Sequence, residues 1–433
     1  MVRGGHSPWV ASSTSRKSAV GAPGPAPPLP FLRMPPPSRA TGEGLAGLAN
    51  LGNTCFLNST LQCLNAVRGL SAYFLSSGLA DDVASGRATS LTLGKVAEAY
   101  AELVRSVWAA GAPPGRVLSP STLRRVVGDL APRFRTYDQQ DSHEVLRFLV
   151  DALSEDTNRL PARAPYRELS DPRAASDAEV GDAWWRYDAS RCDSFPRDLF
   201  AGQMKTCTQC PSCGAVSRAF DSIWDLQLPI PSAAALREGD MWRLRGAGGT
   251  LPDTTLAGLR AAGAAAAGGA DEGRPPPSTG LCTVRHCLAE LTAVETMVEP
   301  FKCTACNVTS PSGAQKTLSV HRAPRILVLQ IRRFLNRRVK LGTAVTFPVR
   351  GLSLAPYMTG GACPGLPMYD LFAVSSHFGH LGSGHYVADA MGVDDVWRRF
   401  DDSTVSETQV GAIDACGAYV LFYARREGSA PSV

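Results

Sequence analysis

Cys55 is the residue whose type and position first indicate chemistry. It follows a tight turn at residues 52–54, and the apolar residues behind it recur at helical spacing, with Thr54 as a suitable N-cap. In the first turn of a helix, free backbone N–H groups and the helix dipole favour negative charge. Such a position can lower a thiol pKa from ~8.5 to roughly 3.5–7.5, particularly beside a histidine. Cys55 is therefore a candidate nucleophile. The alternative is a small buried hydrophobe, which is our interpretation of Cys63 in the same helix.

His385 and a pair of aspartates could supply the other parts of such a site. His385 lies in the segment GSGHYVADA, where it opens a predicted strand, and Asp401 follows it by sixteen residues and is followed by Asp402. That interval suits a hairpin that returns the chain beside the histidine. A carboxylate that accepts the imidazole proton would fix the tautomer and orientation of the ring, as in a set of nucleophile, base and orienting residue. Position alone is a weak indication, because the chain has 7 histidines.

Two Cys-x-x-Cys pairs indicate a metal site. Cys210 and Cys213 form one pair, and Cys303 and Cys306 form the other, ninety residues further on. Four thiolates suit a tetrahedral structural zinc ion with no open position for catalysis. The long separation is unusual for an autonomous zinc finger, but a low-complexity segment accounts for most of it. Unpaired thiols are the alternative, and Cys207 offers a competing pair with Cys210.

Length and composition exclude several classes of protein. The 433 residues are 44% hydrophobic and 19% charged, so the chain can bury a core and is not wholly disordered. The formal net charge of +5 is too small to indicate nucleic-acid binding. No run approaches the about 18 apolar residues of a membrane-spanning helix. The chain contains 12 cysteines, too few for a disulfide scaffold of this length, and no secretory signal is recognisable. We therefore expect a reducing compartment.

The N-terminal half predicts helices between weakly ordered segments. Residues 1–43 are rich in Pro, Ser and Arg, which predicts a disordered tail or, alternatively, an organelle transit peptide. One predicted helix starts at or just after Thr54. Further helical patterns occur over residues 91–109 and in YDQQDSHEVLRFLVDAL. In that last segment Asp141 and Glu144 are spaced as in a capping box.

The remainder of the chain predicts insertions and then strands. Polar and Gly/Pro-rich compositions predict low-complexity surface insertions near 155–191 and 231–280. Short β-branched and aromatic runs in the last third predict strands, and residues 427–433 a disordered tail. Helices first and strands later favour an α+β fold over residues 44–426.

Three long motifs then indicate a family. The segment GLANLGNTCFLNSTLQCL resembles the Cys box of the ubiquitin-specific protease family of deubiquitinases. SHFGHLGSGHYVADA followed by VWRRFDDSTVS resembles its His box, and YDQQDSHEVLRFLVDAL its intervening Gln-Gln-Asp segment. The motifs occur in the family's order. The resemblance implies a papain-like cysteine protease core with a helical thumb, a β-rich palm and zinc-bearing β fingers.

The resemblance also implies roles for individual residues. It makes Cys55 the nucleophile, His385 the general base and Asp401 the residue that orients His385, because Asp401 directly follows an aromatic residue. Asp402 is the substitute for that role, or supports the site through a hydrogen bond. Asn50, five residues before the nucleophile, would donate to the oxyanion of the tetrahedral intermediate.

Substrate and metal contacts follow in the same way. Ubiquitin's C-terminal tail carries arginines, so the resemblance implies that Asp141 and Glu144 pair with them, in addition to any capping role. Glycines at 382 and 384 would line a channel narrow enough for a Gly-Gly tail, so Gly384 is a candidate substrate contact. The cysteine pairs occupy the positions of the family's zinc ligands at the fingertips, and Cys207 falls before them.

The sequence thus predicts a thiol-dependent deubiquitinase with a structural Zn²⁺ ion, no organic cofactor, and ubiquitin and ubiquitinated proteins as partners. Neither nucleic acid nor membrane is expected as a partner, and a monomer is the default. The alternatives are a catalytically weak ubiquitin-binding protein and a protease for a ubiquitin-like modifier. We expect a cytoplasmic or nuclear location, unless residues 1–43 are a transit peptide.

Overall fold

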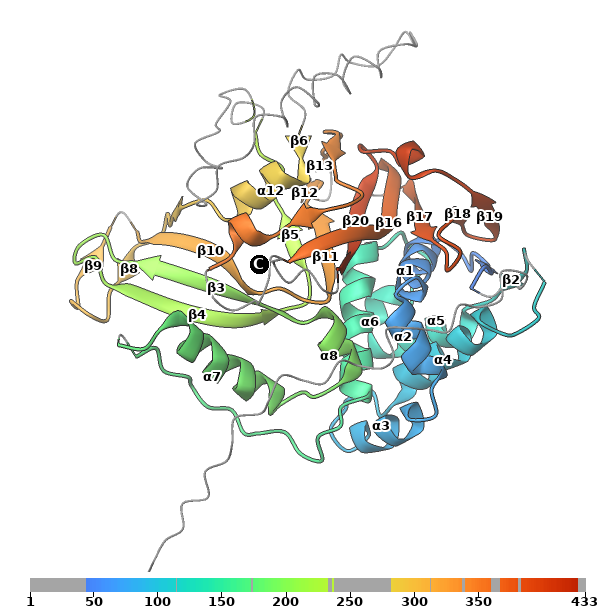
Figure 1. Cartoon of the computed structure of the whole chain (residues 1–433), viewed down its shortest axis with the longest axis horizontal. Helices are drawn as coiled ribbons and strands as arrows, with labels where there is room; N and C mark the ends of the chain where they lie inside the picture. The colour runs from blue at the N-terminus through green and yellow to red at the C-terminus, as the bar shows by residue number, and fades with distance from the viewer. Residues whose placement is uncertain are drawn as a thin grey trace, which may run out of the picture.

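The computed structural model describes residues 44–426, except 114, 173, 233–235, 237–281, 312, 337–338, 360–366 and 381–382. The predicted tails and most of the predicted insertion at 231–280 lie outside the described residues. Helices gather in one half of the described chain, a large sheet fills the other, and a narrower sheet extends to one side (Figure 1). The predicted α+β fold is confirmed.

The helical half, called the thumb here, consists of short helices that pack on one another and on one central helix. Every residue of that helix, α1, is buried, because other helices cover one side and the large sheet covers the other. The thumb elements are α1 (Cys55–Asn65), α2 (Arg68–Leu75), α3 (Leu79–Gly86), α4 (Lys95–Val107), α5 (Ser121–Leu130), the 3₁₀ turn Pro132–Phe134, α6 (Ser142–Asp156) and α8 (Phe195–Phe200). The two-residue strands β1 (Gly47–Leu48) and β2 (Val117–Leu118) pair in parallel beside them.

Helix α4 is shorter than the helix predicted over 91–109, because a buried carboxylate from α6 fixes its start at Lys95. Asp156 is fully buried, and its oxygens accept hydrogen bonds from the backbone N–H groups of Gly94, Val96 and Ala97 at 2.9–3.0 Å. The Ser90 hydroxyl donates to the same carboxylate at 2.5 Å. One side chain thus satisfies the free N–H groups at the start of α4 and joins two helices.

The large sheet, called the palm, contains the strands predicted in the last third of the chain. Among the described residues it has eight strands in the order β19-β18-β17-β16-β20-β11-β5, with β15 beside β16. Its strands are β5 (Leu226–Leu228), β11 (Ile326–Ile331), β15 (Leu352–Ser353), β16 (Met368–His380), β17 (Ser383–Met391), β18 (Trp397–Asp401), β19 (Thr404–Glu407) and β20 (Ala418–Arg425). Helix α1 packs against β17, so the element that begins with Cys55 lies against the strand that carries His385.

The palm's other face and edges carry smaller elements. Helix α12 (Val284–Leu291) packs there with the side chains of β5, and a second apolar cluster fills the space between them. The remaining short elements are β6 (Cys282–Thr283), β12 (Phe334–Asn336), β13 (Val339–Lys340), β14 (Val345–Thr346) and the 3₁₀ turns Ala355–Tyr357 and Val410–Ala412. A bilayer-spanning helix needs about 20 apolar residues, and none of the helices in the described ranges combines such length with such apolarity.

The narrower sheet, called the fingers, extends from the palm (Figure 1). Its strands are in the order β4-β3-β10-β7, and a small hairpin of β8 and β9 lies at its far end. The strands are β3 (Gly202–Gln209), β4 (Val216–Ile223), β7 (Glu295–Thr296), β8 (Phe301–Lys302), β9 (Thr309–Ser310) and β10 (Gln315–Arg322). Strand β3 pairs in antiparallel fashion with β4 and with β10, and the pairing with β10 joins chain segments separated by about a hundred residues.

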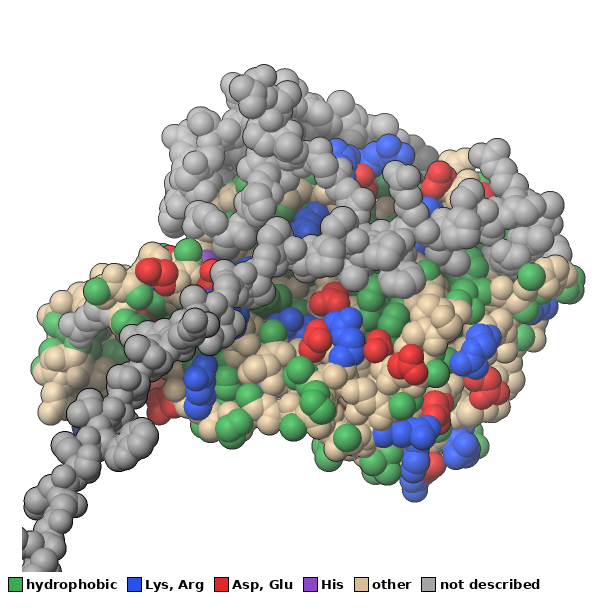
Figure 2. Space-filling view, turned by 60° about the horizontal axis from the view of Figure 1, so that its bottom comes forward, with side chains coloured by type: hydrophobic (Ala, Val, Ile, Leu, Met, Phe, Trp, Pro, Cys, Tyr) green, Lys and Arg blue, Asp and Glu red, His purple; other side chains and the backbone are tan. Residues whose placement is uncertain are grey.

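The predicted insertion at 155–191 is wrong as a low-complexity loop, because it contains helix α7 (Asp177–Ala189), which lies along β4. A capping box between Ser176 and Glu179 starts the helix. Its carboxylates form ion pairs with the fingers and with α8: Asp177 with Lys205 and Arg218, Asp182 with Arg322, and Asp188 with Arg197. Figure 2 shows acidic and basic side chains lying beside one another on the face at the bottom of Figure 1.

Candidate active site

Cys55 is the first residue of α1, as the sequence predicts. The turn before it is built with left-handed backbone at Gly52 (φ 95°) and Asn53 (φ 51°). Thr54 occupies the N-cap position, but its side chain does not cap the helix. Instead the Asn50 Oδ1 atom accepts hydrogen bonds from the N–H groups of Gly52 and Thr54, at 3.0 and 3.2 Å. The Asn50 side chain therefore holds the turn that presents Cys55.

The expectation of a lowered thiol pKa is wrong for this conformation. Cys55 is only 1% exposed, and burial raises the pKa of its thiol above its ordinary value. The backbone N–H of Tyr386 opposes this rise in pKa, and the negative charge of Asp402 adds to it. The helix position predicted from sequence is present, but removal of the sulfur from water has the larger effect. The thiol is therefore protonated at neutral pH.

His385 and Asp401 form the predicted pair. Strands β17 and β18 are the two arms of an antiparallel hairpin, and His385 Nε2 lies 2.6 Å from Asp401 Oδ1. Because Nε2 is engaged with the carboxylate, Nδ1 is the ring nitrogen left for proton transfer. Among the described residues there is no hydrogen bond between the imidazole and the Cys55 sulfur, although the sulfur lies against the backbone of Tyr386, the next residue after His385.

Asp402 has a different position from Asp401. Its Oδ2 atom accepts a hydrogen bond from Asn50 Nδ2, and its Oδ1 atom accepts one from Asn58 Nδ2, both at 2.8 Å. Asn58 is a buried residue of α1, one helical turn after Cys55. Asp402 thus joins the turn before Cys55 to helix α1. Of the two aspartates, Asp401 contacts the imidazole and Asp402 contacts the predicted oxyanion-hole residue.

Gln139 was not predicted as a site residue, yet it contacts the predicted nucleophile. The Cys55 thiol donates to Gln139 Oε1 at 3.8 Å, and Gln139 Nε2 donates to the backbone oxygen of Gly384 at 2.8 Å. Its place in the Gln-Gln-Asp motif was the only signal in the sequence. Asn58 was missed as well, because nothing in the sequence separates it from the other polar residues of α1.

Asp141 and Glu144 lie at the start of α6, but they do not form the predicted capping box. Asp141 Oδ1 accepts from the backbone N–H of His143 at 2.7 Å, and its Oδ2 accepts from the Tyr419 hydroxyl at 2.6 Å. Glu144 is exposed and lies 3.7 Å from Arg133. Asp141 therefore caps the helix alone and ties it to the palm. The contact of both carboxylates with a substrate stays a prediction.

Gly384 is required by close packing. A Cβ atom at this position would lie 2.1 Å from His377 Nε2 and 2.7 Å from the backbone oxygen of Phe378. His377 is buried, and its ring lies against that of Tyr386 at an interplanar angle of 55°, with 4.6 Å between centroids. Gly384 thus permits the strand that carries His385 to approach the neighbouring strand closely. Gly382 lies outside the described residues.

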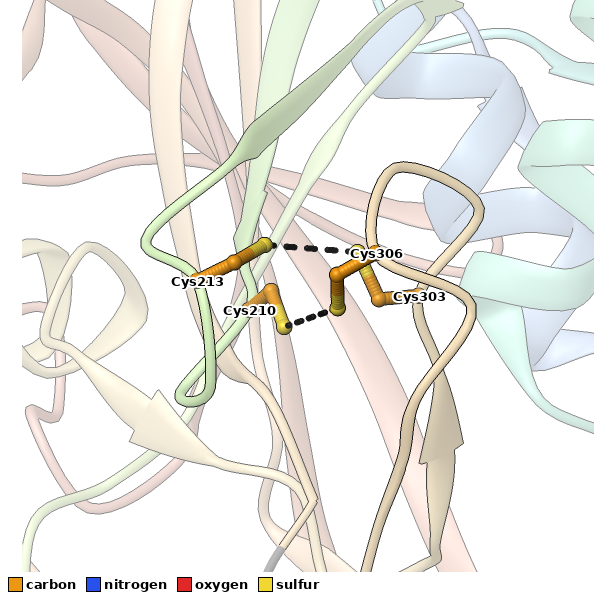
Figure 3. Close-up of side chains that lie close together, drawn as sticks. All are labelled: Cys210, Cys213, Cys303 and Cys306. Carbon is orange, nitrogen blue, oxygen red and sulfur yellow. Dashed lines mark hydrogen bonds between the residues drawn. The ribbon is translucent and has the colours of Figure 1, made fainter.

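The four cysteines predicted as metal ligands come together at the fingers (Figure 3). Cys210 Sγ lies 4.0 Å from Cys306 Sγ, and Cys213 Sγ lies 3.8 Å from Cys303 Sγ. All four sulfur atoms lie within 4.8 Å of one another. Zn–S bonds of about 2.3 Å in a tetrahedron require sulfur atoms roughly 3.8 Å apart, so this arrangement fits a zinc ion. Cys207, the competing candidate, is not in this group.

A thiol at the start of a helix, beside a β-hairpin whose two strands carry a His–Asp pair, is the arrangement of papain-like thiol hydrolases. This is the class that the fold and the site define. A family model described as ubiquitin carboxyl-terminal hydrolase matches residues 46–423. The chain therefore belongs to the ubiquitin carboxyl-terminal hydrolase family, and the resemblance to the ubiquitin-specific proteases is confirmed.

Relatives and solved structures agree with this assignment. The chain is 35% identical over 388 residues to ubiquitin carboxyl-terminal hydrolase 2 of Rattus norvegicus, covering 88% of this chain and 54% of that protein. It is 30% identical to ubiquitin carboxyl-terminal hydrolase 21 of Homo sapiens, covering 96% and 72%. The chain thus spans about half the length of the mammalian hydrolase 2 relatives.

The fold comparison includes a SAGA Ubp8/Sgf11/Sus1/Sgf73 DUB module bound to ubiquitin aldehyde. Its TM-score is 0.59 at 22% identity, with 90% of this chain and 71% of that chain covered. At this level of identity the similarity concerns the fold alone. It confirms the expected architecture of a helical thumb, a β palm and β fingers.

Proposed function

We propose that the protein is a thiol-dependent deubiquitinase that hydrolyses the peptide or isopeptide bond after the C-terminal glycine of ubiquitin. The observation that carries the proposal is the convergence of Cys55, His385 and Asp401 at the junction of α1 and the palm, in a chain of this family. Asp401 holds His385 Nε2 at 2.6 Å, which leaves Nδ1 to act as the base. The hydrogen bond between the Cys55 thiol and His385 is absent from the contacts of the described residues, but catalytic hydrogen bonds of this kind often form only when substrate binds.

The reaction begins with transfer of the Cys55 S–H proton to His385 Nδ1. Because burial raises the pKa of the thiol, this transfer is required to generate the nucleophilic thiolate. The sulfur then forms a bond to the carbonyl carbon of the terminal glycine. As the bond from that carbon to the leaving nitrogen breaks, the proton on His385 passes to the amine. Water, deprotonated by His385, attacks the thioester, releases ubiquitin's carboxylate and restores the thiol.

Asn50 stabilises the oxyanion of both tetrahedral intermediates. One of its two amide hydrogens is donated to Asp402, and the second is available to the oxyanion. Donors of this kind act because they are fixed before charge develops. Asn50 is held on both sides, through Oδ1 by the turn before Cys55 and through Nδ2 by Asp402.

The same proposal assigns a structural zinc ion to the fingers, held by Cys210, Cys213, Cys303 and Cys306. When bound, the ion would crosslink the two segments that carry the cysteine pairs. Four thiolates leave no open coordination position, so the ion has no part in the hydrolysis. Glu144, exposed at the start of α6, and Asp141 are assigned to the basic tail of ubiquitin.

The test is hydrolysis of ubiquitin that carries a fluorogenic amide at its C-terminus. Wild-type protein should turn over this substrate, and Cys55→Ala should abolish turnover with no loss of thermal stability. Cys63→Ala is the matched control, because Cys63 lies in the same helix but is fully buried away from the site; this variant should keep its activity. Folded wild-type protein that binds ubiquitin without turnover would overturn the enzymatic proposal in favour of a ubiquitin-binding protein.

A further inference from the structure

The carboxamide of Gln139 spans the space between the nucleophile and the palm. Gln139 lies in the loop before α6, and its Oε1 atom accepts the Cys55 S–H at 3.8 Å. Its Nε2 atom donates to the backbone oxygen of Gly384 at 2.8 Å and to Asn53 Oδ1 at 3.5 Å. One side chain therefore contacts the nucleophile, the turn before it and the residue before His385.

These contacts occupy positions that a substrate needs. In a reactive complex the carbonyl carbon of the substrate must come within about 3–3.5 Å of the sulfur, on the side from which the base can take the thiol proton. The backbone N–H of the last substrate residue also needs an acceptor once it is buried. Gly384 contributes a backbone oxygen one residue before the base, and in this structure Gln139 already donates to it.

We propose that Gln139 is a positioning residue that acts as a latch: its carboxamide caps the Cys55 thiol and the Gly384 carbonyl in the empty site, and the last residue of the substrate tail replaces it. The inference rests on the proposed function, because it takes Cys55 as the nucleophile. In the exchange, the substrate N–H takes over Gly384 O and the substrate carbonyl takes the place of Gln139 Oε1. Gln139 is only half-buried in the empty site, so its displaced amide can turn out into solvent.

The latch must therefore oppose any molecule that approaches the sulfur. Breaking one hydrogen bond of ordinary strength corresponds to a factor of roughly 2 to 12. Removal of the carboxamide should raise the reactivity of Cys55 by a factor of this size. It should also lower KM for a ubiquitin substrate, because binding no longer has to displace Gln139.

The experiment measures alkylation of Cys55 by iodoacetamide across a range of pH, followed by mass spectrometry of the peptide that contains Cys55. Iodoacetamide is small, so its alkylation rate near neutral pH, where the thiol still carries the proton that Gln139 Oε1 accepts, reports how strongly the capped thiol resists ionisation and reaction. Gln139→Ala should raise this rate near neutral pH about 3- to 10-fold, and KM for the fluorogenic ubiquitin amide should fall by a similar factor. Gln139→Met, which keeps the volume but lacks the donor and acceptor, should behave in the same way.

Gln140→Ala is the matched control. Gln140 is the same residue type at the next position, and its amide contacts Thr136 instead of the nucleophile. Its variant should alkylate at the wild-type rate. If Gln139→Ala loses thermal stability, the comparison rests on Gln139→Met.

An unchanged alkylation rate in a folded Gln139 variant would overturn the latch. So would a fall in kcat with unchanged KM and alkylation, which would indicate direct participation in the reaction. Failure of the proposed function would show differently, as absence of ubiquitin hydrolysis in the wild-type protein. The alkylation rates of Gln139→Ala and wild type can be compared in that case too.

Discussion

Asp402 Oδ2 accepts a hydrogen bond from Asn50 Nδ2 at 2.8 Å, while the neighbouring Asp401 contacts His385. Two consecutive carboxylates thus serve different parts of the site. Asp401 ends β18, and Asp402 follows it in left-handed backbone (φ 47°) in the turn to β19. That reversal directs the two side chains to different partners, one to His385 and the other to Asn50.

The first prediction separates these two roles. Asp401→Ala should reduce kcat/KM by about 10²–10⁴-fold and change its pH dependence, because the imidazole loses the partner that fixes its tautomer. Asp402→Ala should reduce kcat by about 10²–10³-fold, because Asn50 is no longer held toward the oxyanion, and should move only the thiol limb of the profile to lower pH, because the charge of Asp402 raises the pKa of Cys55. The measurement is the pH profile of hydrolysis of the fluorogenic ubiquitin amide. Identical changes of the pH profile in the two variants would contradict separate roles for Asp401 and Asp402.

The second prediction concerns acid sensitivity. Burial lowers the pKa of His377 to about 4, and the positive charge of Lys340 acts in the same direction. The folded protein holds this imidazole neutral, whereas the unfolded chain protonates it near 6.5. The stability that results is complete above pH 6.5 and is lost as the pH falls from 6.5 to about 4, by up to about 3 kcal/mol.

Denaturant unfolding at a series of pH values tests this. His377→Leu should flatten the fall in free energy of unfolding between pH 6.5 and 4 relative to wild type. His380→Leu is the control, because His380 is exposed at the end of the same strand and its charge contributes least to the lowered pKa of His377, so this variant should change the slope far less. A wild-type slope in the His377 variant would assign the acid sensitivity to other groups.

The third prediction concerns Asp156. Asp156→Ala would leave three backbone N–H groups at the start of α4 without their acceptor in the thumb core. We expect a loss of about 3 kcal/mol in the free energy of unfolding, measured by chemical denaturation. Asp151→Ala, on the exposed side of the same helix, should change it by less than about 0.5 kcal/mol. A small effect at Asp156 would show that solvent satisfies those N–H groups.

What the sequence could predict depended on how local each signal was. Cys55, His385 and Asp401 were found because each lies in a contiguous motif with a helix start or strand around it. Asp156 and Gln139 were not found, because their partners lie far along the chain, such as Gly384 at 245 positions from Gln139. Spacing alone does not indicate such contacts.

Composition misled the interpretation of α7. Its polar, proline-flanked sequence suggested a loop, since few of its residues are buried. The helix is held by ion pairs to the fingers and by its capping box. Only the capping box is visible in the sequence, as Ser176 and Glu179. In the same way, the raised pKa of Cys55 could not be predicted from its helix position, because it depends on how deeply the palm buries the sulfur.

The last prediction concerns the four cysteines of the fingers. If they hold zinc, freshly purified protein should contain about one zinc ion per chain. Cys213→Ser should remove it, because one of four thiolate ligands is lost. Cys207→Ser is the matched control: Cys207 lies on the neighbouring strand β3 but outside the sulfur cluster, so its variant should retain the metal. Metal analysis and thermal unfolding with and without a chelator provide the measurements.

Zinc-free wild-type protein whose unfolding temperature is the same with and without chelator would contradict a structural metal. Loss of zinc from the Cys207 variant instead would show that the competing pair is the true ligand set.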